Sequence, residues 1–168
     1  MYRSPSRMLV SFLFCSVVLA ACGGSYSSPA SGGSGGTLSG SGMKLTTASS
    51  GYGTVLALSN GQTVYMFTAD TTTSSACNST CVTIWRPVAG GKVVGGAGVS
   101  GANLGSISRS DGSKQLTYNG HPLYTYVGDN SSGSVSGQNI NSFGGHWYLV
   151  SPAGSRVTSK PTASVSGY

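Results

Sequence analysis

Short runs of apolar and β-branched residues, separated by turn-forming pairs, fill the chain after Lys44 and predict β-strands. The clearest runs are 55–58, 64–68, 115–118 and 123–127, where apolar side chains are spaced for the two faces of a strand. Glycine, proline and β-branched residues interrupt the chain every several residues, and no capped apolar pattern at helical spacing occurs. The pattern therefore predicts an all-β fold.

One segment of this pattern occurs twice. Residues 59–70 align without gaps on residues 118–129, at a constant offset of 59 positions. In both copies Asn-Gly precedes the apolar run, and this pair is the strongest short signal for a two-residue hairpin turn because both positions tolerate positive φ. We therefore expect each copy to begin as a hairpin, in which the run before Asn-Gly pairs with the run after it. Asp111-Gly112 predicts a further turn before the second copy.

The repeated strand carries apolar side chains on both faces, which is typical of a central strand. Because residues two apart share a face, the rings of each copy form a row. These rings are Tyr65 and Phe67 in the first copy and Tyr124 and Tyr126 in the second. The opposite face carries Val64, Met66, Leu123 and Val127. Neither half can cover its row alone, so we expect one compact domain of two related half-sheets, packed as a small sandwich or barrel. The rows could instead form a platform for a glycan or a flat ligand.

Charge is scarce in this chain. Charged residues make up 7% of the sequence against a usual value of about 25%, and the acidic residues are three aspartates with no glutamate. The full chain carries a net charge of +6. Removal of the N-terminal segment with Arg3 and Arg7 leaves seven Lys and Arg and three Asp, a net charge of +4. The basic residues are scattered singly, so the composition does not favour nucleic acid as a partner.

The N-terminus has the pattern of an export signal. Two arginines precede an apolar stretch that begins at Met8 and is shorter than the roughly 20 residues of a membrane span. We therefore interpret residues 1–21 as a removable signal peptide. The end of this stretch, Leu19-Ala20-Ala21-Cys22, resembles the lipobox of bacterial lipoproteins. The resemblance implies that Cys22 is acylated and becomes the first residue of the mature chain.

The remaining chain divides by composition. Residues 22–43 are rich in glycine and serine and predict a disordered tether. Residues 44–168 have the length of one compact β domain, with the two repeats at about 53–95 and 106–155.

Motifs in and around the two copies resemble a known family. The signature Tyr-x-aromatic-x-x-Asp consists of Tyr65, Phe67 and Asp70, and again of Tyr124, Tyr126 and Asp129. Cys77, Cys81 and Trp85-Arg86-Pro87 follow the first copy, and Gly144-Gly145-His146-Trp147-Tyr148 follows the second. Together they resemble the bacterial secreted-repeat lipoproteins, a family of unknown function, so no catalytic assignment can be carried over from the resemblance. The family usually has two prolines after the first tryptophan, where this chain has Arg86 and then Pro87.

Cys77 and Cys81 flank three residues, and the oxidising compartment of an exported protein favours a disulfide between them. The alternative is a thiolate pair for a soft metal such as copper, which this spacing permits. His121 and His146 would then have to complete the metal site, although both lie in the other half of the sequence.

The other polar candidates have a structural and a functional interpretation. Asp70 and Asp129 each follow a repeated strand, where aspartate commonly accepts hydrogen bonds from the backbone of a turn. As a symmetric pair they could instead act as acid and base or hold a cation. His121 aligns with Gln62, which indicates a polar position beside a turn. His146 is expected to be exposed, on the face opposite the neighbouring tryptophan.

The sequence has no motif that predicts catalysis, such as a Gly-x-Ser-x-Gly elbow or a His-Glu-x-x-His pair. We predict a lipid-anchored protein of the bacterial cell envelope, on the periplasmic face or the cell surface. Its β domain is expected to be non-catalytic, to need no cofactor and to have a structural or interaction role. The expected partners are the membrane, through acyl chains on Cys22, and an envelope protein or a cell-wall polymer. The alternatives are a module for a small ligand or a copper-type metal, and an unrecognised enzyme.

Overall fold

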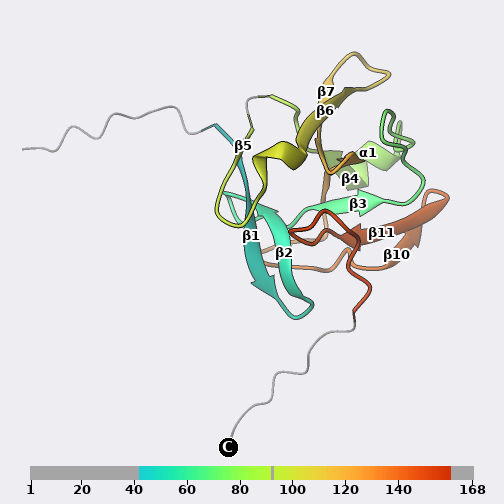
Figure 1. Cartoon of the computed structure of the whole chain (residues 1–168). Helices are drawn as coiled ribbons and strands as arrows, with labels where there is room; N and C mark the ends of the chain where they lie inside the picture. Colours follow the sequence, from blue (N-terminus) through green and yellow to red (C-terminus); the bar gives the residue numbers. More distant parts are fainter. Residues whose placement is uncertain (1–41, 92, 160–168) are drawn as a thin grey trace, which may run out of the picture. The chain divides into compact units, whose positions relative to one another are not determined.

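The computed structural model describes residues 42–91 and 93–159, which belong to one compact unit (Figure 1). The predicted signal peptide, the predicted lipidation site at Cys22 and most of the predicted tether lie outside the described residues. The domain and repeat boundaries drawn from the sequence therefore stay predictions.

The described residues form short strands joined by turns. The strands are β1 Lys44–Ser50, β2 Gly53–Leu58, β3 Tyr65–Phe67, β4 Trp85–Pro87, β5 Val94–Gly95, β6 Leu104–Ser108, β7 Lys114–Tyr118, β8 His121–Pro122, β9 Tyr124–Tyr126, β10 Ile140–Ser142 and β11 Gly145–Leu149. Two single helical turns, α1 Cys81–Ile84 and a 3-10 turn at Gly101–Asn103, were not predicted. Neither of these described turns has the length and apolarity needed to cross a bilayer. The predicted all-β fold class is confirmed.

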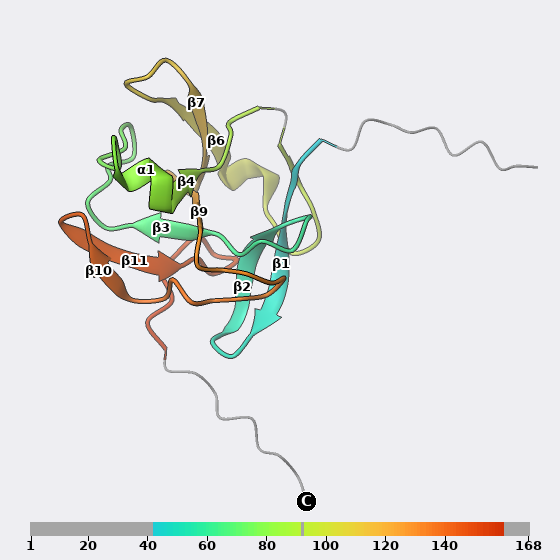
Figure 2. The ribbon, with the colours of Figure 1, turned by 180° about the vertical axis from the view of Figure 1, so that it is seen from behind.

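Three sheets curl into a half-barrel. The largest has the strand order β10-β11-β3-β9-β4, and the others have the orders β2-β1-β5 and β6-β7-β8. Strand β1 pairs antiparallel with β2, and β6 pairs with β7 in the same way, so each repeat opens with a hairpin of its own. Figure 2 shows these two hairpins well apart, with β3 between them.

In the largest sheet the two repeats exchange strands. The strands that carry the repeated signature, β3 and β9, pair antiparallel with each other, and the tryptophan strand of each repeat pairs with the signature strand of the other. The opposed residues are Tyr65 and Tyr124, Phe67 and Trp147, and Tyr126 and Trp85. From β11 to β4, neighbouring strands therefore alternate between the second and the first repeat. The predicted central position of the repeated strands is correct.

The hairpins predicted around Asn-Gly are only partly formed. In the second copy Asn119 and Gly120 both have positive φ, as a two-residue turn requires, and β7 pairs with β8 across them. In the first copy only Gly61 has positive φ and the chain bridges from Ala57 to Thr63, so the predicted two-residue turn is wrong there. The main partner of β2 is instead β1. Beyond these first pairs β3 and β9 join the largest sheet, where their rings are buried against the other repeat.

The two faces of β3 and β9 are buried in two apolar clusters. One contains the signature rings, both tryptophans and the two cysteines. The other contains Val64, Met66, Leu123 and leucines of β1, β2 and β7. The predicted division between the faces is therefore correct, except that Val127 lies beyond β9 and is 38% exposed. The rows of rings are part of the core rather than a platform for a flat ligand.

Candidate functional site

The tyrosines and aspartates of the two signatures bind each other across the repeats. The Tyr65 hydroxyl donates to Asp129 Oδ2 at 2.7 Å, and the Tyr124 hydroxyl donates to Asp70 Oδ2 at 2.7 Å. We call Tyr65–Asp129 and Tyr124–Asp70 the cross-repeat pairs. The other oxygen of each aspartate, Oδ1, accepts a backbone N–H of its own loop at 2.8 Å. The aspartates thus have the turn role that the sequence favoured, together with a second partner that it did not indicate.

The protonation of the cross-repeat pairs follows from their burial. Burial and the neighbouring carboxylate raise the pKa of Tyr65 and of Tyr124 far above the ordinary value of 10.0. Burial also raises the pKa of Asp70, although its hydrogen bonds from Tyr124 and from the backbone oppose this shift. The phenols therefore keep their protons at neutral pH and act as donors, which makes them poor bases and poor nucleophiles.

Both tryptophans and two of the four signature rings form one continuous stack. Phe67 stacks on Trp147 at 4.1 Å between ring centroids, Trp147 stacks on Trp85 at 4.0 Å, and Trp85 stacks on Tyr126 at 4.3 Å. Each repeat contributes two of the four rings, and both tryptophans are fully buried. Aromatic pairs at this spacing contribute about 0.5–1.5 kcal/mol each beyond their buried area. The stack therefore holds the repeats together rather than facing solvent.

Gly137 is required where the stack meets a cross-repeat pair. Its N–H donates to the Tyr65 hydroxyl at 3.2 Å. A Cβ at this position would lie 2.8 Å from the Trp85 ring and 2.9 Å from the Tyr65 ring, which is closer than real side-chain contacts. Only glycine therefore allows the backbone to reach the phenol.

Cys77 and Cys81 form the disulfide that the sequence favoured, with their Cα atoms 5.3 Å apart. The bond leaves neither thiol for the alternative thiolate metal site. Among the described residues no group of three or more His, Cys, Asp or Glu side chains is placed to hold a metal ion. The disulfide packs in the cluster of the signature rings and anchors the loop that carries Asp70.

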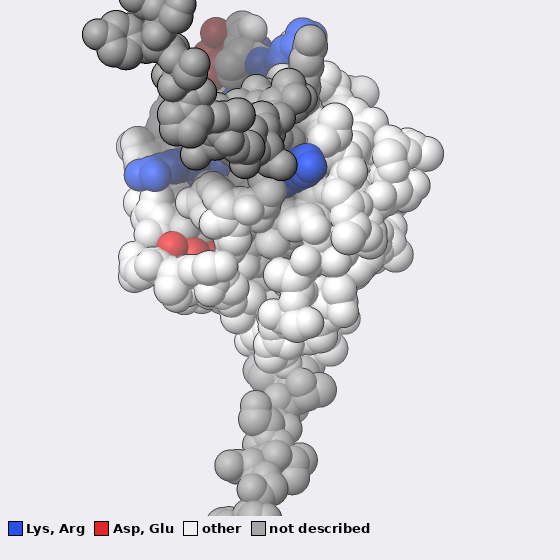
Figure 3. All heavy atoms as spheres, turned by 90° about the vertical axis from the view of Figure 1, so that its left-hand side faces the viewer, with Lys and Arg blue, Asp and Glu red and all other residues white. Residues whose placement is uncertain are grey.

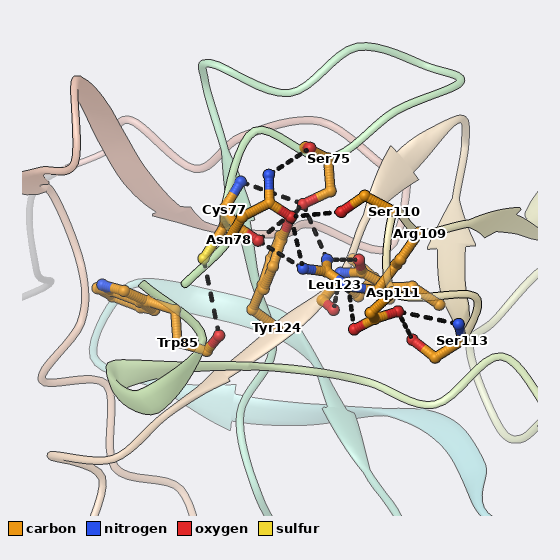
Figure 4. A network of polar contacts seen from close by, with 11 residues as sticks. Ser75, Cys77, Asn78, Trp85, Arg109, Ser110, Asp111, Ser113, Leu123 and Tyr124 are labelled. Atoms are coloured by element: carbon orange, nitrogen blue, oxygen red, sulfur yellow. Dashed lines mark hydrogen bonds and ion pairs between the residues drawn. The ribbon is translucent and has the colours of Figure 1, made fainter. Parts of the chain in front are cut away.

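Arg109, which the sequence analysis did not single out, lies at the centre of a polar network beside this loop (Figure 4). Its side chain is almost fully buried, with 7% of the residue exposed. Nη1 donates to Ser75 Oγ at 2.8 Å and to Gln115 Oε1, and Nη2 donates to the Cys77 carbonyl. Ser75 Oγ also lies 2.7 Å from the Tyr124 hydroxyl, so the network reaches a cross-repeat pair.

One signal in the sequence could have found this arginine. Arg109 follows Ile107 by two residues, and alternation places both side chains on the same, buried face of the hairpin. A cation at an inward position must find acceptors, since burying an unpaired charge is costly.

His121 lines an open cleft of about 360 Å³. The other residues of the cleft are Met66, Phe67, Thr68, Asp70, Ser155 and Arg156. Burial lowers the pKa of His121 from the ordinary value of 6.5, so the imidazole is neutral at pH 7. The cleft combines a neutral imidazole, a cation and a carboxylate with apolar side chains.

His146 lies on the face opposite Trp147, as predicted, but it is half-buried rather than exposed. Its ring packs over Tyr148 with the centroids 6.0 Å apart, and its Nδ1 is buried without a hydrogen-bond partner among the described residues. The Arg156 guanidinium lies over the Tyr148 ring, 5.6 Å from its centroid. His146 does not line the cleft of His121.

Comparison with known proteins gives one family. A family model described as a secreted repeat of unknown function matches the chain twice, at residues 46–89 and 105–151. The two matches contain the two signatures and their exchanged tryptophans. No curated protein and no solved structure matches the chain.

Proposed function

Since the chain belongs to the family of secreted repeats of unknown function, we propose that it is a lipid-anchored envelope protein whose extracytoplasmic β domain binds or supports a partner and catalyses no reaction. The observation that supports this proposal is the bonding within the cross-repeat pairs. Two of the three carboxylates of the sequence, and the phenols beside them, have each other as partners, so they serve to join the repeats. The domain then acts as a rigid body at the end of a tether, which suits interaction rather than chemistry.

The non-catalytic role is tested by Asp70→Asn in a strain that lacks the wild-type gene. The amide oxygen still accepts the loop N–H of Ala76, and its NH2 group donates to the Tyr124 hydroxyl oxygen, which can in turn donate to Ser75 Oγ. The substitution removes the negative charge that acid–base chemistry or a cation would require. We expect the variant, once its near-UV circular dichroism shows a native fold, to restore the envelope phenotype of the deletion strain. Asp129→Asn is the matched variant on the other repeat. A folded Asp70→Asn protein that fails to restore the phenotype would contradict the proposal.

The lipid anchor is tested by Cys22→Ser. Each buried methylene contributes about 0.8 kcal/mol, so two or three acyl chains hold a protein firmly whereas none leaves only weak surface contacts. We expect the wild-type protein to incorporate labelled palmitate and to remain in the membrane fraction after a carbonate wash. The variant should incorporate no label and appear in the soluble fraction. Equal membrane association of both proteins would refute acylation at Cys22 as the anchor.

A second candidate function is supported by the cleft of His121, which combines Arg156, Asp70 and apolar side chains in about 360 Å³. Clefts of this size and mixed character suit small organic molecules. Because the cysteines are joined in a disulfide, this candidate no longer includes the thiolate metal site. A thermal-shift screen with monosaccharides and amino acids tests it. A ligand that raises Tm for wild type but not for Arg156→Gln would support it, and a screen without hits would leave the cleft without a role.

A partner in the envelope is tested by sedimentation with purified peptidoglycan. Figure 3 shows charged side chains standing apart on a mostly uncharged face, which suits hydrogen bonding to a polar polymer more than charge pairing. We expect binding that persists at high salt, since screening affects only charge contacts. Binding that disappears at high salt would indicate charge attraction instead.

A further inference from the structure

The fold gathers three cations around one cleft of about 340 Å³. They are Arg86, Arg109 and Lys114, which lie in two separate stretches of the sequence. The chain after β4 bonds along β7, through Leu116 N to the Val88 carbonyl and Gly90 N to the Lys114 carbonyl, both at 2.8 Å. This pairing joins the first repeat to the second and brings Arg86 to the same cleft as Lys114.

The deepest of these cations is Arg109, and one of its donors has no hydrogen-bond acceptor among residues 42–91 and 93–159. Nη1 and Nη2 are used within the network of Figure 4, whereas Nε is buried and makes no hydrogen bond to this part of the chain. The nearest opposite charge is Asp111 Oδ2, at 3.8 Å from Nε, which is an ion-pair distance beyond hydrogen-bond reach. The arginine therefore has an unpartnered N–H on the side of Asp111, which lines the same cleft.

Asp111 does not neutralise the cleft. Its Oδ1 accepts the backbone N–H of Ser113 at 2.9 Å and the Ser113 hydroxyl at 2.6 Å, which holds the carboxylate in the turn. These bonds lower the pKa of Asp111, so it stays ionised. Three cations then face one carboxylate, which leaves a net charge of +2 on the residues that line the cleft.

We propose that this cleft binds a small organic phosphate in free solution. The Arg86 and Lys114 side chains, which are both exposed, contact the phosphate oxygens, and the fixed charge of Arg109 attracts the same group from below. A phosphate ester carries a charge of about −1.5 to −2 at pH 7, which matches the net charge of the cleft. Val82, Pro87 and Ala89 also line the cleft and offer apolar contacts to the carbon part of the ligand. This site goes beyond the proposed function, because it requires neither the lipid anchor nor an envelope partner.

The test is isothermal titration calorimetry of the full-length protein in a non-ionic detergent, with glycerol 1-phosphate as the probe. We expect glycerol 1-phosphate to bind more tightly than inorganic phosphate, and glycerol not to bind. Arg86→Gln and Lys114→Gln should each weaken binding about tenfold, which is the effect of losing one charge-assisted contact. Asp111→Asn should strengthen binding, since the amide keeps the bonds to Ser113 but removes the competing negative charge.

The matched control is Lys44→Gln, which removes one positive charge from β1, outside the residues that line this cleft. It should leave the affinity unchanged. Absence of binding by the wild type, or equal weakening by Lys44→Gln, would overturn the proposal, because the latter means attraction to net charge alone. Vesicles of phosphatidylglycerol identify the source of the phosphate. Binding to these vesicles but not to glycerol 1-phosphate would also overturn it, because the site would then serve a membrane surface.

Discussion

Removing the Tyr65 hydroxyl tests whether the cross-repeat pairs hold the two repeats together. Tyr65→Phe keeps the ring edge-on against Trp85 but deletes the donor to Asp129 Oδ2 and the acceptor of the Gly137 N–H. A hydrogen bond to a charged group contributes about 1.5–3 kcal/mol, and an amide left without its acceptor costs about 1 kcal/mol more. We therefore expect the free energy of unfolding to fall by about 2–4 kcal/mol.

Tyr124→Phe should have a similar effect, because Tyr124 occupies the equivalent position and donates to Asp70 at the same distance of 2.7 Å. The assay is urea unfolding of the full-length protein followed by tryptophan fluorescence, since both tryptophans lie in the stack between the repeats. At about 4 °C per kcal/mol for a domain of this size, either variant should also lower Tm by roughly 10 °C. Tyr126→Phe is the matched control, because the first repeat has Phe67 at that position and the Tyr126 hydroxyl makes no hydrogen bond among the described residues.

A double-mutant cycle distinguishes pairing across the repeats from pairing within one repeat. Tyr124→Phe combined with Asp70→Asn should show a coupling energy of more than 1 kcal/mol, since the two side chains are bonded. Tyr65→Phe combined with Asp70→Asn joins residues of the same repeat that do not bond, and should be additive within about 0.5 kcal/mol. Coupling within the repeat, or losses no larger than that of Tyr126→Phe, would refute the exchange of partners.

Three further predictions follow from the same geometry. Cys77→Ser combined with Cys81→Ser should lower the free energy of unfolding by about 2 kcal/mol, the loop-closure contribution of so small a ring, and addition of a reductant to the variant should change nothing further in a urea titration. His121 should make stability depend on pH: since its folded pKa lies below the unfolded value of 6.5, its contribution is complete above pH 6.5 and is lost as the pH falls through the folded value. His121→Gln should therefore lose less stability than wild type between pH 7 and pH 5, and parallel pH profiles would contradict this. Residues 42–92 and 93–159, expressed as separate chains, should each lack near-UV circular dichroism and recover it when mixed, because the largest sheet takes strands alternately from both; a native signal from either half alone would disprove the exchange.

The fold class and the core positions were predictable because they depend on local signals. Strand runs, their two faces and the turn at Asp111-Gly112 follow from alternation and from residues that tolerate positive φ. The disulfide followed from the short spacing of its cysteines in an exported protein. The first Asn-Gly turn was mispredicted, because Asn60 takes a negative φ there and the loop is longer than two residues.

The partners of those strands could not be predicted. Because the two repeats have similar strands, the local pattern of a strand fits a partner in its own repeat as well as one in the other repeat. Whether Asp70 accepts a hydrogen bond from Tyr124 or from Tyr65 depends on which strand pairing buries both tryptophans at once. That is a property of the whole chain. The role of Arg109 was hidden for the same reason, since two of its acceptors, Ser75 Oγ and the Cys77 carbonyl, lie more than 30 residues away.

The sequence by itself determined that two copies of a β unit, with aromatic rows and a local disulfide, must share one core. Only the tertiary structure decided that the copies exchange strands, that their tyrosines and aspartates bond across the repeats and that three scattered cations meet at one cleft. Local conformational preference acts between near neighbours in the chain, whereas strand partners and charge clusters are selected by the burial of surfaces that come together only in the folded state.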